Sequence, residues 1–211
     1  MTERPKIAPE SGHGLERVIF FSDAVIAIAL TLLAIELPVP SGEDWVHQLK
    51  EYLGSDYVAF LISFAVIATL WFNHHRMFQQ IARLTYGMIW LNILGLFAIV
   101  LMPFATKVLT GLGDHPAGPV FYACVMVLWA VVWILMAQTA TRQQLWSEDA
   151  PTTAPSNMVF GASALLVAFG LSIPIAFADP DWATFFWISA WPISTIGMRI
   201  RRGRQERAAA Q

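Results

Sequence analysis

A single aspartate stands deep inside the first long apolar segment of this sequence. Asp23 follows Phe21 and Ser22, Arg17 precedes them, and residues 24–35 carry no charge. An ionised carboxylate within the hydrocarbon of a bilayer costs several kcal/mol unless it has a partner or water, so such a residue marks a functional site by default. We therefore look for the activity in this segment.

Two adjacent histidines lie near the end of the second apolar segment. The run from Trp71 to Arg76 reads Trp-Phe-Asn-His-His-Arg, so that Asn73, His74 and His75 stand together. One interpretation is a polar staple between helices, since lipid offers no partner to a buried polar group. The other is a proton relay, because histidine titrates near neutral pH. A metal site on a helix favours histidines one turn apart, so adjacent histidines argue against it.

Composition assigns these residues to a membrane protein. Of the 211 residues, 56% are hydrophobic and 13% are charged, whereas a soluble domain carries about 25% charged residues. The apolar residues form long blocks, and a membrane span needs roughly 20 of them. Six spans are predicted, at residues 18–38, 55–76, 86–109, 118–140, 157–178 and 182–198. We expect an all-α membrane protein with one transmembrane domain over residues 1–211.

The basic residues indicate the orientation of the chain. The side that holds both termini carries every lysine and arginine except Lys50 and Lys107. The positive-inside rule then predicts a multi-pass protein of the cell membrane, with residues 1–16 and the basic tail 199–211 in the cytoplasm. We interpret the tail as a topology signal in contact with lipid, and expect no nucleic-acid partner. The outer loops are acidic, which raises the local concentration of cations.

This topology brings the polar residues to one depth. Asp23 lies about two turns into the first span, residues 73–75 lie near the inner end of the second, and Asn92 lies about two turns into the third, at roughly 1.5 Å per residue. All of them should occupy one layer in the inner leaflet. We expect Asp23 and Ser22 to hydrogen-bond to the histidines and to Asn92, with Arg17 nearby.

No enzyme motif appears in the chain. The sequence contains no HExxH, no GxSxG and no P-loop, and Cys124 is its one cysteine. A disulfide within the chain is therefore impossible, and the cysteine spacing typical of a metal site is lacking. We expect no catalytic residue, no bound metal and no cofactor.

Four sequence motifs together point to a known family. They are Arg-x-x-x-Phe-Ser-Asp over residues 17–23, Trp-x-x-His-His over 71–75, Leu-Asn at 91–92, and Met-Pro-Phe-Ala-Thr over 102–106. In these motifs the chain resembles the prokaryotic members of the transmembrane protein 175 family, relatives of the lysosomal potassium channel. The resemblance covers the first three spans best. It implies six helices per subunit and a homotetramer with a central pore lined by the first helix.

The resemblance also assigns roles to residues. It implies a structural network near the cytoplasmic end, made by Arg17, Phe21, Ser22, Asp23, Trp71, Asn73, His74, His75 and Asn92. It implies a constriction made by the first helix just beyond the motif, at Ile28, Thr31, Leu32 and Ile35. These four fall at i, i+3, i+4 and i+7, which is one helical stripe. Periodicity alone would assign that stripe to packing.

The function implied is passive conduction of potassium ions across the lipid bilayer. The sequence lacks the Thr-Val-Gly-Tyr-Gly filter whose carbonyl rings select potassium in other channels. Ile28 and Ile35 would instead form apolar rings that dehydrate ions or close the pore by dewetting. Thr31 would add a hydroxyl, and Glu36 would attract cations at the outer mouth. Potassium is the permeant ion and no other metal is expected.

A proton-coupled secondary transporter is the alternative function. It would use Asp23 with His74 or His75 as a proton relay. Such transporters usually contain inverted repeats with paired broken helices. Residues 1–109 and 110–211 show no such repeat, and the second half has no counterpart of the Phe-Ser-Asp stretch.

Overall fold

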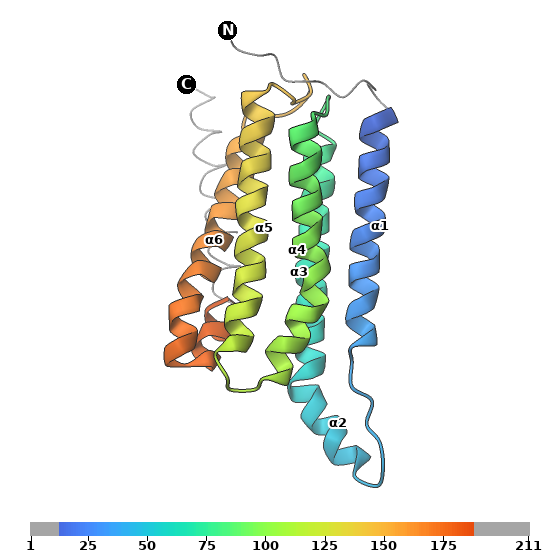
Figure 1. Ribbon diagram of the computed structural model, residues 1–211, viewed down its shortest axis with the longest axis vertical. Coiled ribbons are helices and arrows are strands. Elements are labelled where there is room, and N and C mark those ends of the chain that lie inside the picture. Colours follow the sequence, from blue (N-terminus) through green and yellow to red (C-terminus); the bar gives the residue numbers. More distant parts are fainter. Residues whose placement is uncertain (1–12, 188–211) are drawn as a thin grey trace, which may run out of the picture.

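The computed structural model describes residues 13–187, and its architecture is helical (Figure 1). The helices are α1 (His13–Ile35), α2 (Trp45–Gly54), α3 (Asp56–Phe78), α4 (Tyr86–Gly111), α5 (Ala117–Arg142) and α6 (Ala154–Ala178). Residues 180–187 are helical as well, and Asp179 separates them from α6. Within the described residues, five helices are long and apolar enough to cross a membrane, with α2 and α3 counted together as one of them.

The predicted all-α membrane architecture is confirmed, and the first five predicted spans coincide with α1, α3, α4, α5 and α6. The sixth predicted span, residues 182–198, begins in the helical stretch 180–187, and its remainder lies outside the described residues. The first span ends earlier than predicted, at Ile35 rather than at residue 38. Pro38 and Pro40 follow it, and a residue before proline avoids the α region.

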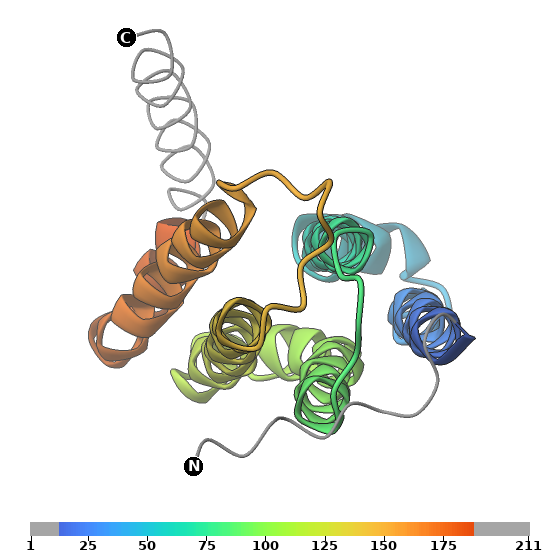
Figure 2. The ribbon, with the colours of Figure 1, turned by 90° about the horizontal axis from the view of Figure 1, so that it is seen from above.

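Helix α1 stands at one edge of the bundle (Figures 1 and 2). It packs on α3 and α4, while α5 packs on α4 and on α6 at the opposite edge. The bundle therefore covers one side of α1 and leaves the other side open. Helix α2 extends past the end of the bundle (Figure 1), and none of its residues is buried.

The two linkers at the end of the bundle opposite α2 are joined by backbone hydrogen bonds. The Ala82 amide donates to the Leu145 carbonyl at 2.8 Å, and the Ser147 amide donates to the Gln80 carbonyl at 2.8 Å. Thr85 caps α4 by accepting from the Met88 amide at 3.3 Å. The two backbone bonds tie the α3–α4 connection to the α5–α6 connection. They therefore hold together the ends of α3, α4, α5 and α6, of which α3 and α4 contact α1.

A polar contact crosses the apolar core near the α2 end of the bundle. Thr106 of α4 donates to the Ser63 hydroxyl of α3 at 2.8 Å, and Ser63 lies 3.3 Å from the hydroxyl of Tyr122 on α5. All three side chains are buried. Since lipid cannot satisfy these groups, their mutual bonds fix the register of three helices.

Candidate pore-lining site

A buried chain of hydrogen bonds joins three helices at the end of the bundle away from α2. The Asn92 amide on α4 donates to Ser22 Oγ on α1 at 2.9 Å, and Ser22 Oγ donates to the Val18 carbonyl at 2.8 Å. His74 Nε2 on α3 lies 2.8 Å from Asn92 Oδ1. An amide oxygen only accepts, so His74 is the donor in this bond. The predicted bond between Ser22 and Asn92 is present, whereas His74 bonds to Asn92 and not to Ser22. The chain through Asn92 anchors α1 to α3 and α4.

Asp23 makes a different bond from the one expected. Its Oδ1 accepts from Trp71 Nε1 at 2.8 Å, and neither histidine contacts it by a hydrogen bond. His74 and His75 are separated by about 100° around the helix, because α-helices have about 3.6 residues per turn. His74 faces α4, while His75 stacks on Trp71 and bonds to Gln79 at 2.8 Å. The prediction that Asp23 bonds to a histidine is therefore wrong, and Trp71 is its hydrogen-bond partner instead.

The remaining residues assigned to this network lie at its margin. Asn73 is half-buried, and its side chain makes no hydrogen bond within residues 13–187. Arg17 and Phe21 are exposed on α1. The network in the structure is thus a pair of separate contacts, one through Asn92 and one through Trp71.

The bond between Asp23 and Trp71 should stabilise the fold without setting ion preference. We expect Trp71→Phe to lower the free energy of unfolding by about 1–2 kcal/mol, since it removes one charge-assisted hydrogen bond that is partly open to the surface. Asp23→Ala should lower the yield of assembled protein more than it changes the ratio of potassium to sodium permeability. Thermal unfolding in detergent measures the first effect, with Thr69→Val on the exposed side of α3 as the control.

A double variant tests whether the two side chains share one interaction. Asp23→Asn combined with Trp71→Phe should cost clearly less than the sum of the single changes. Strict additivity of the two costs would contradict the bond.

The four residues of the predicted stripe lie on the open side of α1. Ile28 is 58% exposed, Ile35 is 75% exposed, and Leu32 and Thr31 are exposed as well. The opposite side of the helix is buried against α3 and α4, by Ile26, Ala29 and Leu33. Within the part of the chain that the structure describes, no helix covers the stripe. It is an apolar surface that a second molecule or the membrane must cover.

Thr31 is oriented by a local bond. Its Oγ1 donates to the Ile28 carbonyl at 2.8 Å. A hydroxyl has one hydrogen and two lone pairs, so this bond uses the hydrogen and leaves the lone pairs of an exposed oxygen available. In the middle of an apolar stripe, such an oxygen can accept from water or coordinate a cation.

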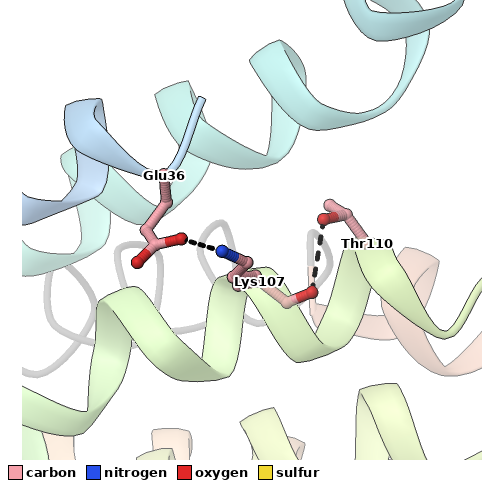
Figure 3. A network of polar contacts seen from close by, with 3 residues as sticks. All are labelled: Glu36, Lys107 and Thr110. Atoms are coloured by element: carbon pink, nitrogen blue, oxygen red, sulfur yellow. Dashed lines mark hydrogen bonds and ion pairs between the residues drawn. The ribbon is translucent and has the colours of Figure 1, made fainter. Parts of the chain in front are cut away.

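An ion pair lies at the end of α1 nearest α2. Glu36, directly after α1, pairs with Lys107 of α4, and Thr110 follows one turn later on the same helix (Figure 3). The tyrosine hydroxyl of Tyr57 also donates to the Pro38 carbonyl at 3.0 Å. The carboxylate expected to attract cations therefore has a compensating positive charge beside it.

Sequence reasoning missed Lys107 and the three hydroxyl groups that meet near the α2 end. Ser63, Thr106 and Tyr122 are isolated polar residues in separate apolar segments, and only the packing of α3, α4 and α5 brings them together. Lys107 did carry a signal, since it is one of two lysines outside the basic side of the chain. Among the described residues, no group of three or more histidine, cysteine or acidic side chains could hold a metal.

Comparison with known proteins identifies the family. The family model described as endosomal/lysosomal potassium channel TMEM175 matches residues 17–103, which cover most of α1, the whole of α3 and most of α4. A potassium channel of Chamaesiphon minutus is 35% identical over 182 residues, covering 78% of this chain and 87% of the relative. The endosomal/lysosomal proton channel TMEM175 of Mus musculus is 28% identical and aligns over 40% of its own length.

A solved structure agrees with this result. The crystal structure of a lysosomal potassium-selective channel TMEM175 homolog from Chamaesiphon minutus matches with a TM-score of 0.57 and 28% identity, over 84% of this chain and 98% of that one. Sequence and fold thus agree over most of the molecule, and this chain belongs to the TMEM175 family of potassium channels.

Proposed function

We propose that this protein is a potassium-permeable cation channel, in which four copies surround a central pore lined by α1. The exposed stripe on α1 carries the proposal. Ile28 and Ile35 lie open along one side of a helix whose other side is fixed by Ser22 and Leu33. A rigidly held helix with an unpartnered face suits a pore wall, because the wall must keep its position while ions pass.

More than one copy is needed to enclose such a pore. The described residues of one chain cover only one side of α1, which stands at the edge of the bundle (Figure 2). Cyclic symmetry places the same helix from each copy around a common axis. Four copies of α1 would then face each other across the pore, in the cell membrane and with both termini in the cytoplasm.

Conduction would follow from the order of residues along the stripe. Rings of Ile28 and Ile35 exclude water from narrow sections, so an ion must lose part of its hydration shell to cross them. Thr31 lies between them, and its free lone pairs offer an oxygen where the ion has lost water oxygens. No resident cofactor is needed, since the ion moves down its own gradient. An ion channel is not an enzyme, and no catalytic residue is proposed.

The Thr31 oxygen should contribute to the preference for potassium. We expect Thr31→Val to reduce the ratio of potassium to sodium permeability by about threefold or more, because it replaces the hydroxyl by a methyl group of similar size. Thr31→Ser keeps the oxygen and serves as the matched control. Reversal potentials between potassium and sodium solutions give the ratio, and equal ratios in Thr31→Val and the wild type would remove Thr31 from the ion path.

The transporter alternative receives less support from the geometry. A relay between Asp23 and the histidines needs hydrogen-bonded neighbours, whereas Asp23 bonds to Trp71 and His74 bonds to Asn92. The mouse relative is named a proton channel, so proton movement belongs in any functional test. Passive potassium conduction and proton-coupled uptake differ in their driving force, which an imposed pH gradient separates.

A further inference from the structure

The ion pair between Glu36 and Lys107 joins the pore-lining helix to its neighbour at one end. Glu36 comes one residue after Ile35, the last residue of the exposed stripe, and Lys107 lies in the last turns of α4 (Figure 3). The two residues are far apart in the sequence, so the pair forms only because α1 packs on α4.

The pair contributes little to the stability of the fold. The Lys107 side chain is 61% exposed and the Glu36 side chain is 39% exposed. Exposed ion pairs gain little free energy, because water and salt screen the attraction and two long side chains must be ordered. The anchoring of α1 rests instead on buried contacts, through Ser22 and Leu33. A purely structural explanation of Lys107 is therefore weak.

The effect of Lys107 on ions near the end of α1 is larger than its effect on stability. Charges of one sign at a mouth with low-dielectric walls raise the local concentration of the opposite ion. A free Glu36 would enrich cations beside the stripe, and the ammonium group of Lys107 cancels that charge at contact distance. With both present, this pair of side chains adds almost no net charge at the end of α1.

We propose that Lys107 limits the cation conductance of the pore by neutralising Glu36 at its outer mouth. This inference rests on the proposed channel function, and it assigns a role in conduction to a residue outside the α1 stripe. Lys107 acts on the permeant ion through the field at the mouth and leaves the constriction unchanged. The ratio of potassium to sodium permeability should therefore stay constant while the conductance changes.

The test is single-channel recording in bilayers of neutral lipid at two salt concentrations. At about 10 mM salt the Debye length is about 30 Å, and at about 1 M it is about 3 Å. We expect Lys107→Met to raise the potassium conductance about threefold or more at low salt, and Glu36→Gln to lower it, because each leaves one unpaired charge per copy. The double variant should return to the wild-type conductance. All differences should vanish at high salt.

Thr110→Val supplies the matched control. Thr110 lies one turn from Lys107, and within residues 13–187 its hydroxyl hydrogen-bonds to the Lys107 carbonyl alone. The change therefore alters the same surface without altering charge. If the wild type conducts potassium and Lys107→Met has the same conductance at low salt, this inference is wrong while the proposed channel function stands. A difference that persists at high salt would overturn it as well, since screening does not remove a structural change. A wild-type protein that conducts no potassium would overturn the proposed function together with this inference.

Discussion

Ile28→Asn should increase potassium conductance and reduce discrimination against sodium. Ile28 is 58% exposed in the single chain, on the side of α1 that the rest of the molecule leaves open. In the proposed pore it forms an apolar ring that excludes water. An amide at each of these positions would hold water in the ring, so that ions cross it with more of their hydration shell intact. Because sodium gives up its water less readily than potassium, the permeability to sodium would increase most.

We expect the ratio of potassium to sodium permeability to fall about tenfold. This corresponds to a change of about 1.4 kcal/mol in the difference between the energy barriers for the two ions. Reversal potentials and unitary conductance measure both quantities in the same recording. Ile28→Val should stay close to the wild type, because the ring remains apolar. Ile93→Asn places the same amide at an exposed isoleucine on α4 and serves as the control. If Ile28→Asn conducts like the wild type, the constriction does not lie at Ile28.

Asn92→Leu should destabilise the protein more than any single change at Asp23. Asn92 is 2% exposed, and its amide is bonded on both sides, to Ser22 and to His74. Leucine branches at the same carbon but has no polar atoms, so the His74 ring and the Ser22 hydroxyl would each lose a buried partner. Each orphaned polar group costs about 1–3 kcal/mol, which gives about 2–6 kcal/mol for the two groups together.

Thermal unfolding and the yield of assembled protein in mild detergent measure this loss. Asn73→Leu is the matched control, since Asn73 lies in the same region of the bundle without a side-chain hydrogen bond among the described residues. Combining Asn92→Leu with His74→Phe should recover part of the stability, because no unpaired imidazole then remains. A normal melting temperature for Asn92→Leu would show that the buried chain does not hold α1.

The helices could be predicted from the sequence, because they depend on local patterns. The open stripe could be predicted only with the family resemblance, because periodicity alone assigns it to packing. Long apolar blocks define the spans, and a period near 3.6 assigns Ile28, Thr31 and Ile35 to one face of a helix. The ends were less predictable, since α1 stops at Ile35 in response to the prolines that follow. The segment between the first two predicted spans is an acidic outer loop in the sequence analysis, whereas the structure places helix α2 within it.

Side-chain partners across helices could be predicted only in part. Depth along the membrane correctly brought Ser22, Asn92 and His74 together. Depth does not determine the rotation of a helix, and for that reason it did not reveal that Trp71 rather than a histidine reaches Asp23. The same limit applies to Glu36, whose charge was assigned to ion attraction without its partner Lys107.

A flux assay on the purified protein in liposomes decides whether this protein is a channel. Vesicles that contain the protein are loaded with potassium and placed in sodium solution without a pH gradient. They should lose potassium far faster than protein-free vesicles loaded in the same way, because ions pass the α1 pore down their own gradient. Ile28→Asn should accelerate that loss. Absence of passive potassium flux, together with uptake that requires an imposed pH gradient and disappears in Asp23→Asn, would contradict the channel and establish a proton-coupled transporter.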